Sequence, residues 1–228
     1  MLDSRIILFV NEKKMNIKRY IFGLIFVLQK YKKAEIKISK EKYQYFTRWH
    51  RKIPFYKNKA IPCLIKTDIE LSGYLKSING KNSPCYFSRK ALRFGYVFSE
   101  INRNGYLEDI NKINLSAPYR QGKRMEESYV DPVKEYDCLC YGVLMDGKLV
   151  AYVEINQSNE IAVINKILGH FDYLKDGIMY LLLVGTIKRL WHNHKWIMYD
   201  SMIFNSVGMK LFKKRFNFEN WRVKWLEE

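Results

Sequence analysis

The stretch "ILGHFDYLKDGIMYLLLVGTIKRL" (167–190) decides how the rest of the chain is interpreted. Its first residues end an apolar run at Gly169 and His170, a short charged turn follows, and 177–191 reads as a helix that is apolar almost all round. Such a helix is expected to be buried. A strand that ends at a glycine and leads into a helix N-terminus is also where proteins often bind an anion. The junction is therefore the predicted centre of the fold and a candidate phosphate site.

The segments on either side of this helix predict a sheet. "CLCYGVLMDGKLVAYVEI" (138–155) contains two apolar runs separated by Asp146 and Gly147, which is a strong hairpin signal. The third and fourth predicted strands are joined through the helix, so we expect them to be parallel, with the helix on one face of the sheet. The remaining predicted elements are strands at 160–168, 195–202 and 221–228 and a short amphipathic helix at 206–216.

The signals weaken toward the N-terminus. Residues 88–95 predict a basic helix that ends at Gly95, with a strand through Val97 and Phe98 after it. In the first 85 residues, short apolar runs do not separate strand from helix. The other expected elements are strands at 5–10 and 34–39, helices at 17–31, 40–52 and 106–117, a polar loop at 119–129 and an extended segment after Pro54.

The net charge favours anionic partners. Forty basic residues against 23 acidic ones give +17, which suits nucleic acid, an acidic membrane surface or a polyphosphorylated cofactor. The apolar run at 20–28 is too short to cross a bilayer. We interpret it as a buried helix and keep a membrane-surface helix as the alternative, because lysines flank it.

The cysteines indicate neither a zinc site nor a disulfide framework. Cys63, Cys85, Cys138 and Cys140 include no CxxC pair. Cys138 and Cys140 alternate in a predicted strand, so they are expected to face the same side. We predict reduced thiols, a cytoplasmic protein and no bound metal.

The order of elements from residue 88 onward resembles the acyl-CoA N-acyltransferase (GNAT) superfamily. "GMKLFKKRFNFENWRVKW" (208–225) looks like the family's ending, and "SRKALRFG" (88–95) and "GIMYLLLVGTIKRL" (177–190) are similar to helices of the Fem-type and polysaccharide-associated transferases. The resemblance implies an α/β (α+β) fold with a mixed, mostly antiparallel sheet, helices on both faces, and a parallel strand pair around the central helix. It assigns 88–228 to a transferase core and leaves 1–87 as a lobe of the same domain or a small appended lobe.

Two features depart from the family pattern. "HFDYLKDG" (170–177) stands where the resemblance places a glycine-rich pyrophosphate loop, and Gly177 is its only glycine. Asp176 there is a good N-cap residue for the helix. Near Leu211 and Phe212, where many members carry a tyrosine as general acid, the chain has no hydroxyl. The donor is therefore left open between an acyl-CoA and an aminoacyl-tRNA.

Four residues are candidates for catalysis. Acyl transfer to an amine needs a base for the amine and donors for the developing oxyanion. His170 at the strand end can exchange protons near neutral pH, or it can cap the corner. Glu154 in "LVAYVEI" could be a buried base or could meet water. Asp200, with Tyr199 beside it, ends a buried strand where ligands of α/β sheets bind.

A second set of residues is predicted to bind the donor or the acceptor. The loop "YRQGKRM" groups hydrogen-bonding side chains that could clamp a phosphate or carboxylate, or be solvated. Arg89 and Arg93 are spaced to share a helix face. The full set of binding candidates is Arg89, Arg93, Arg120, Gln121, Lys123, Arg124, Lys175, Gly177 and Ser201.

We therefore expect a transferase that moves an acyl or aminoacyl group from a thioester or a charged tRNA to an amine. The acceptor would be a small amine of a sugar, peptide or cell-envelope precursor, reached in the cytoplasm or at the inner face of the membrane through a peripheral contact. Two alternatives stay open. One is a basic nucleic-acid-binding protein, for which "KYQYFTRWHRK" (42–52) is the best candidate. The other is a catalytically silent partner subunit with the transferase fold.

Overall fold

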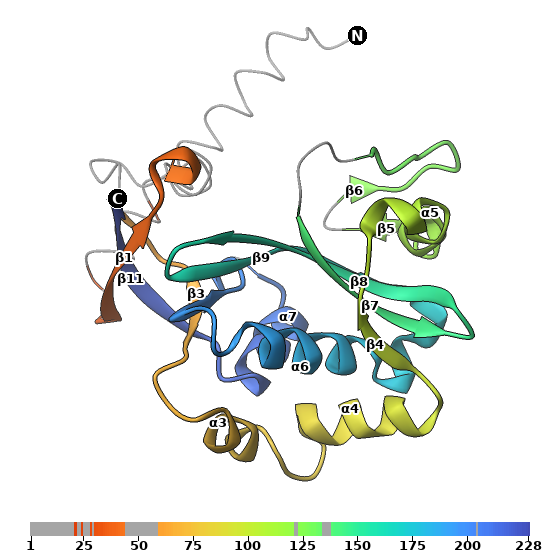
Figure 1. Ribbon diagram of the computed structural model, residues 1–228, viewed down its shortest axis with the longest axis horizontal. Helices are drawn as coiled ribbons and strands as arrows, with labels where there is room; N and C mark the ends of the chain where they lie inside the picture. Colours follow the sequence, from red (N-terminus) through yellow and green to blue (C-terminus); the bar gives the residue numbers. More distant parts are fainter. Residues whose placement is uncertain are drawn as a thin grey trace, which may run out of the picture.

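The computed structural model describes residues 30–43, 59–120, 123–133, 138–203 and 205–228, and the single positions 21, 24 and 28 (Figure 1). The expected strand at 5–10 lies outside the described residues, as do most of the expected helices at 17–31 and 40–52. The nucleic-acid candidate at 42–52 is also almost entirely outside them.

A nine-stranded mixed sheet organises the described residues. Along its main path the strand order is β1-β11-β3-β10-β9-β8-β7-β4, and β2 pairs with β11. β5 and β6 form a separate two-stranded hairpin. The strands are β1 (Lys32–Ile38), β2 (Lys59–Ala60), β3 (Cys63–Lys66), β4 (Val97–Glu100), β5 (Tyr119–Arg120), β6 (Lys123–Arg124), β7 (Leu139–Met145), β8 (Lys148–Ser158), β9 (Ile161–Gly169), β10 (Trp196–Met198) and β11 (Glu219–Glu227).

The predicted hairpin is confirmed. β7 and β8 pair antiparallel, and Asp146 and Gly147 between them have φ values of 50° and 77°, the left-handed conformations that a tight hairpin turn requires. β9 extends the same antiparallel sheet. The β8–β9 pairing shifts by one residue at Glu154/Ile155, which leaves Asn165 as an extra residue in β9. This β-bulge bends the strand in the middle.

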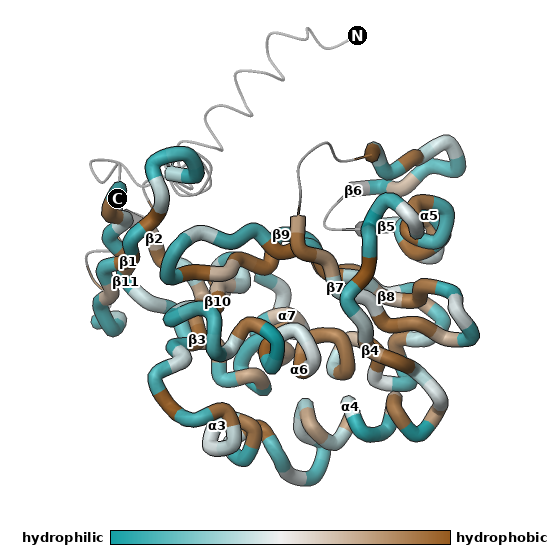
Figure 2. The backbone as a smooth tube through the Cα atoms, in the orientation of Figure 1, coloured by the Kyte–Doolittle hydropathy of each residue, from teal (hydrophilic) through white to brown (hydrophobic). Residues whose placement is uncertain are grey.

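The buried helix is also confirmed. α6 (Ile178–Leu190) buries Leu182, Leu183 and Ile187 completely and connects β9 to β10, which run parallel as expected. Figure 2 shows the corresponding hydrophobic stretch running through the middle of the fold beside β8 and β9. Burial of an almost entirely apolar helix against the sheet is the main source of its stability.

Helices cover both faces of the sheet, so the predicted fold class is confirmed. On the α6 face, α4 (Pro84–Arg93) lies against α6 and begins at Ser83, whose Oγ accepts a hydrogen bond from the Tyr86 N–H at 3.3 Å. α5 packs against β8 and β9 on the opposite face, where Ile110 and Ile113 contact Tyr152. The other helices are α3 (Leu71–Ser77), α5 (Leu107–Leu115), α7 (Val207–Arg215) and the 3₁₀ helices η1 (Arg103–Tyr106) and η2 (Phe171–Asp176).

Two strands from the N-terminal third join this sheet. β1, expected from 34–39, pairs parallel with β11 along its whole length. β3 lies between β10 and β11 and is antiparallel to both. One sheet thus contains strands from both sides of the predicted boundary at residue 87, and the division into two lobes stays a prediction. Among the described residues, no helix has the length and apolarity needed to span a membrane.

Candidate functional site

The strands β9 and β10 separate in the centre of the sheet. They pair over three residues only, and the last pair is Val163 with Met198. After Met198 the chain turns toward β3, where the Tyr199 N–H donates to the Cys63 carbonyl at 2.9 Å and the Cys63 N–H donates to the Asp200 carbonyl at 2.5 Å. β9 continues to Gly169 without β10 beside it. We call this region the fork, and it lies at the carboxyl ends of two parallel strands, where α/β sheets bind ligands.

The turn that follows β10 is held in an unusual conformation. Asp200 is exposed and has a φ of 49°, in the left-handed region that non-glycine residues seldom adopt. The Ser201 carbonyl accepts hydrogen bonds from Asn205 Nδ2 at 2.5 Å and from Lys213 Nζ at 2.9 Å. Strained backbone of this kind persists only where its surroundings fix it, and it occurs preferentially at functional sites. The predicted residues Tyr199, Asp200 and Ser201 therefore share one braced turn at the fork.

Lys213 is a residue that sequence reasoning missed. It lies on α7 and is 1% exposed, with its ammonium 4.4 Å from the centre of the Tyr199 ring. Burial lowers its pKa, and the charges of Asp200 and Cys63 oppose that shift. The basic run around it in the sequence, at 210–215, gave no sign that one of its lysines turns inward.

The Cys63 thiol beside this turn is not a nucleophile at neutral pH, because burial raises its pKa to about 12. Burial also raises the pKa of the Tyr199 hydroxyl, which lies 3.7 Å from Met209 Sδ. Both groups are therefore protonated under ordinary conditions. Asp200 is the exposed carboxylate of the turn.

Replacing Lys213 with methionine is expected to flatten the alkaline pH dependence of stability. Because the folded pKa lies below the usual 10.5, the unfolded chain holds this proton where the folded protein has lost it. Wild-type stability then rises with pH between the lowered pKa and 10.5. Between about pH 7 and about pH 10, the urea midpoint of wild type should rise relative to that of Lys213→Met. If the urea midpoints of the two proteins change with pH in parallel, the assignment of Lys213 as a buried cation is contradicted.

His170 ends β9 at the far end of the fork. Its backbone N–H donates to the Val150 carbonyl at 2.8 Å, and its ring centre lies 5.1 Å from that of Tyr173. Nδ1 is 3.7 Å from Asp172 Oδ2. The ring makes no capping hydrogen bond to η2, so the capping interpretation is wrong. Its role in proton transfer stays a prediction.

The N-terminus of α6 is packed against α4. Gly177 has a φ of 91°, and a Cβ placed there would lie 2.6 Å from the Phe87 carbonyl oxygen. The Asp176 carboxylate accepts a hydrogen bond from the Tyr96 hydroxyl at 2.7 Å, so the prediction that it caps the helix is wrong. Lys90 Nζ donates to the Lys175 carbonyl at 2.9 Å. Two oxygen-bearing groups thus lie at the helix end where a pyrophosphate would need donors.

Glu154 is buried, so the solvent-facing interpretation of this residue is wrong. It is 1% exposed and accepts a hydrogen bond from Arg103 Nε at 2.8 Å. Arg103 also forms an ion pair with Asp131, which in turn pairs with Lys166 of β9. Asn114 Nδ2 donates to Asp131 at 3.0 Å. The four charges form a buried network of two cations and two carboxylates, which makes Glu154 a structural ion-pair partner in this arrangement.

The predicted binding loop is a small hairpin whose flanking residues contact η2 on one side and β9 on the other. The chain enters it after Ser116, whose Oγ accepts from the Phe171 N–H at 2.9 Å, and leaves it at Asp131, which pairs with Lys166. Arg120 lies in β5, and Lys123 and Arg124 lie in β6. Gln121 lies outside the described residues, so its role in binding stays a prediction.

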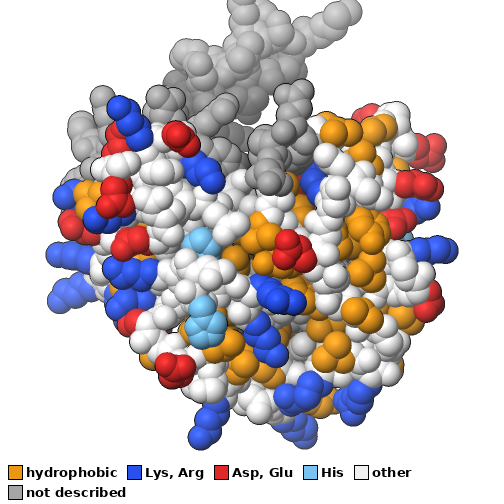
Figure 3. All heavy atoms as spheres, viewed as in Figure 1, with side chains coloured by type: hydrophobic (Ala, Val, Ile, Leu, Met, Phe, Trp, Pro, Cys, Tyr) orange, Lys and Arg blue, Asp and Glu red, His pale blue; other side chains and the backbone are white. Residues whose placement is uncertain are grey.

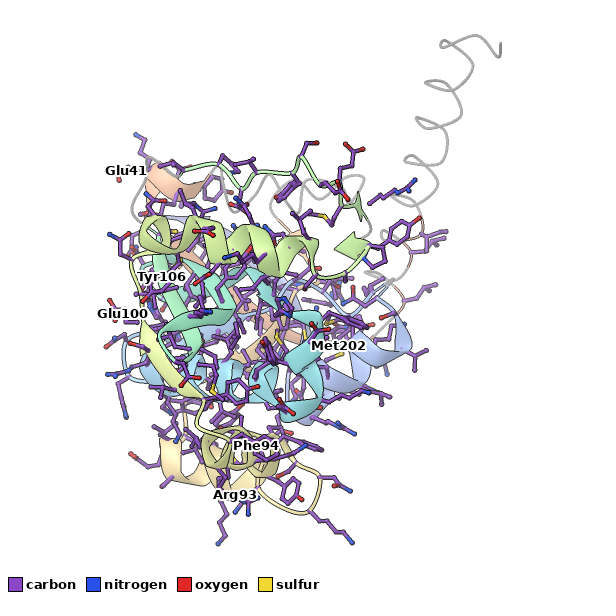
Figure 4. All side chains as sticks on the ribbon, turned by 90° about the vertical axis from the view of Figure 1, so that its right-hand side faces the viewer. Glu41, Arg93, Phe94, Glu100, Tyr106 and Met202 are labelled. Carbon is purple, nitrogen blue, oxygen red and sulfur yellow. The ribbon has the colours of Figure 1, made fainter. Side chains whose placement is uncertain are left out.

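The other predicted basic residues lie away from the fork. Arg89 and Arg93 share the outer face of α4, as their spacing predicted, and Arg89 donates to Asn79 Oδ1 at 3.0 Å. Figure 4 shows Arg93 at the edge of the molecule and Met202 near its centre. A pocket of about 540 Å³ lies near Trp191, at the C-terminal end of α6, and none of the predicted site residues line it.

The structure therefore divides the predicted residues into three groups. Tyr199, Asp200 and Ser201 lie at the fork, and His170, Lys175 and Gly177 lie at the β9–α6 corner. Glu154, the hairpin residues and the α4 arginines occupy other places.

Cys138 Sγ and Cys140 Sγ are 3.7 Å apart, which confirms that they face one side. Within the described residues no group of three or more metal-ligating side chains occurs.

Comparisons with known proteins find similarity in structure and none in sequence. No protein-family model and no curated protein matches the chain. The C-terminal domain of a putative lysylphosphatidylglycerol synthetase from Agrobacterium fabrum superposes with a TM-score of 0.53 at 17% identity, over 71% of this chain and 57% of that one. L-PGS from Bacillus licheniformis gives 0.51 at 14% identity, over 70% and 57%. FemX gives 0.55 at 8% identity, over 70% and 59%.

These identities establish the fold and nothing more. The chain spans 57–59% of the length of the three proteins. One of the three is FemX, which agrees with the Fem-type resemblance noted in the sequence. The described part of the chain shares the fold of these three solved structures.

Proposed function

We propose that the protein transfers an aminoacyl or acyl group to an amine, and that the reaction takes place at the fork between β9 and β10. The observation that carries this proposal is the braced turn at Asp200, placed where two parallel strands separate inside a transferase fold. Asp200 and Asn165, the bulge residue of β9, each follow the Val163–Met198 pair by two residues. Bulges and strained turns are both enriched at active sites.

The surroundings of α6 favour an aminoacyl-tRNA over an acyl-CoA as donor. A CoA pyrophosphate would need free N–H groups at the start of α6. There the Phe87 carbonyl lies against Gly177, and the Asp176 carboxylate adds a negative charge nearby. A charged tRNA requires only that its terminal ester reach the fork, and the chain's charge of +17 suits a large polyanion.

The chemistry proposed for the fork follows from these groups. The amine nitrogen attacks the ester carbonyl, a C–N bond forms, and the ester C–O bond breaks to release the ribose hydroxyl. Asp200 takes the proton from the attacking amine, and that proton balances the one gained by the leaving hydroxyl.

The direct test is transfer from labelled donors. We expect the protein to move label from radiolabelled aminoacyl-tRNA, more than from labelled acetyl-CoA, to at least one acceptor among glucosamine, a lysine-containing peptide and phosphatidylethanolamine vesicles. Transfer from acetyl-CoA alone would overturn the donor assignment. No transfer from either donor, with tight binding of uncharged tRNA and single strands, would favour the nucleic-acid-binding alternative.

Replacing Asp200 with asparagine is expected to lower kcat by about 10²-fold, which is the lower end of the range for a general base. Asparagine tolerates the left-handed conformation, so the turn should keep its shape. Asp146→Asn is the matched control, because Asp146 is also exposed and has a φ of 50°. Equal turnover in the two variants would remove Asp200 from the mechanism.

A further inference from the structure

We infer that the surface formed by the end of α4 and by η2 docks the protein on an anionic lipid bilayer. This surface, the α4–η2 patch, consists of Phe94, Phe171 and Leu174 with Lys90, Arg93 and Lys175. The inference does not rest on the proposed function, because membrane partition is measured without turnover.

The patch exposes large apolar side chains. Phe94 is 49% exposed, Phe171 58% and Leu174 37%. Phe171 and Leu174 are three residues apart in a 3₁₀ helix, so they lie on the same side of it. Large apolar side chains left exposed on neighbouring elements are a mark of interaction surfaces.

The two segments of the patch are in direct contact. Lys90 Nζ donates to the Lys175 carbonyl at 2.9 Å and lies 5.3 Å from the centre of the Phe94 ring. Lys90 therefore lies beside both the Phe94 ring of one segment and the backbone of the other. In Figure 3, lysine and arginine side chains gather along the lower edge of the molecule, where α3 and α4 lie, with hydrophobic side chains between them. Figure 4 shows Arg93 and Phe94 together at that edge.

The charge of the patch fits an anionic surface. Lys90, Arg93 and Lys175 supply three positive charges. Asp172 and Asp176 oppose them as two carboxylates, of which Asp176 accepts a hydrogen bond from the Tyr96 hydroxyl, so positive charge remains in excess. Basic residues beside aromatic and aliphatic side chains are the composition of surfaces that insert into the headgroup region of anionic membranes.

A lipid surface explains the patch better than a nucleic acid does. Aromatic rings could stack on bases, but a nucleic acid offers Leu174 no apolar partner. The Phe87 carbonyl oxygen also lies against Gly177 at the start of α6 beside the patch, which disfavours a phosphate there. A bilayer buries all three apolar side chains at once. It would also bring the corner at His170, at the end of β9, close to amines at the membrane surface.

The test is co-sedimentation with vesicles of three parts phosphatidylcholine to one part phosphatidylglycerol. We expect the full chain to bind these vesicles, and to bind pure phosphatidylcholine vesicles or yeast RNA more weakly. The variant Phe94→Glu/Phe171→Glu should lose at least about tenfold in partition. Binding should also weaken at about 0.5 M salt, since the Debye length shortens.

Two control variants separate the patch from general effects. Ile69→Glu/Ser72→Glu adds the same charge at exposed positions near the other end of α6 and should keep wild-type binding. Arg93→Glu/Lys175→Glu should lose the preference for phosphatidylglycerol, whereas Lys33→Glu/Lys40→Glu should retain it. Every variant carries the same residues 1–32, so the apolar run at 20–28 is constant across the comparison. Undiminished binding of Phe94→Glu/Phe171→Glu, or stronger binding to RNA than to the anionic vesicles, would overturn the inference.

Discussion

Replacing Arg103 with methionine is expected to lower the free energy of unfolding by about 3 to 5 kcal/mol, because the change leaves two buried carboxylates without their shared cation. Asp131 and Glu154 are 2% and 1% exposed and both pair with Arg103. Arg103 also donates to the Pro132 carbonyl at 2.8 Å, so its loss frees the segment that carries Asp131. Urea denaturation monitored by circular dichroism measures the change.

Two further variants show whether charge is the cause. Adding Glu154→Gln to Arg103→Met removes one of the stranded charges and should restore part of the lost stability. Lys112→Met breaks an exposed pair with Glu108 and should leave the urea midpoint unchanged. If the double variant is no more stable than Arg103→Met, then lost packing rather than unpaired charge explains the effect.

Replacing Gly177 with alanine is expected to lower the free energy of unfolding by about 2 to 5 kcal/mol, as the sum of left-handed strain and overpacking. The φ of 91° disfavours any residue with a Cβ, and the new methyl group would lie 2.6 Å from the Phe87 carbonyl oxygen. The start of α6 would have to move away from α4. Urea denaturation again gives the magnitude.

Gly147→Ala is the matched control for this change. Gly147 has a similar φ of 77° but no atom within 4 Å of its added Cβ, so only the strain of about 1 to 2 kcal/mol applies. The difference between the two variants measures the contact between α4 and α6. If the two variants lose equal free energy of unfolding, α4 and α6 separate at little cost. The argument against a pyrophosphate at this helix end would then lose its support.

Elements that depend on nearby residues could be predicted from the sequence. The hairpin at Asp146 and Gly147 follows from two residues that accept positive φ between apolar runs. α6 follows from its uniform apolarity, and the parallel β9–β10 pair follows from the crossover rule. The segment 208–225, which resembles the family's ending, turns at Asn217 before β11, where φ is 59°.

The composition of the site could be predicted only in part. The sequence placed Asp200 at the end of a strand at 195–202, whereas the strand ends at Met198 and Asp200 lies in the turn that follows. It did not show that Lys213 turns inward to the Ser201 carbonyl, since lysines in a basic run are usually solvated. It also left Glu154 open between water and the interior, because its partner Arg103 is 51 positions away.

The sequence by itself determined the order of elements from residue 88 onward, the central helix and the hairpin, because these depend on patterns within a few residues. Only the tertiary structure decided that β3 enters the sheet between β10 and β11, and that Gly177 is required by contact with Phe87. Strand neighbours, buried ion pairs and close backbone contacts depend on where the chain returns in space. That return is set by the burial of the whole apolar core, and no short stretch of sequence encodes it.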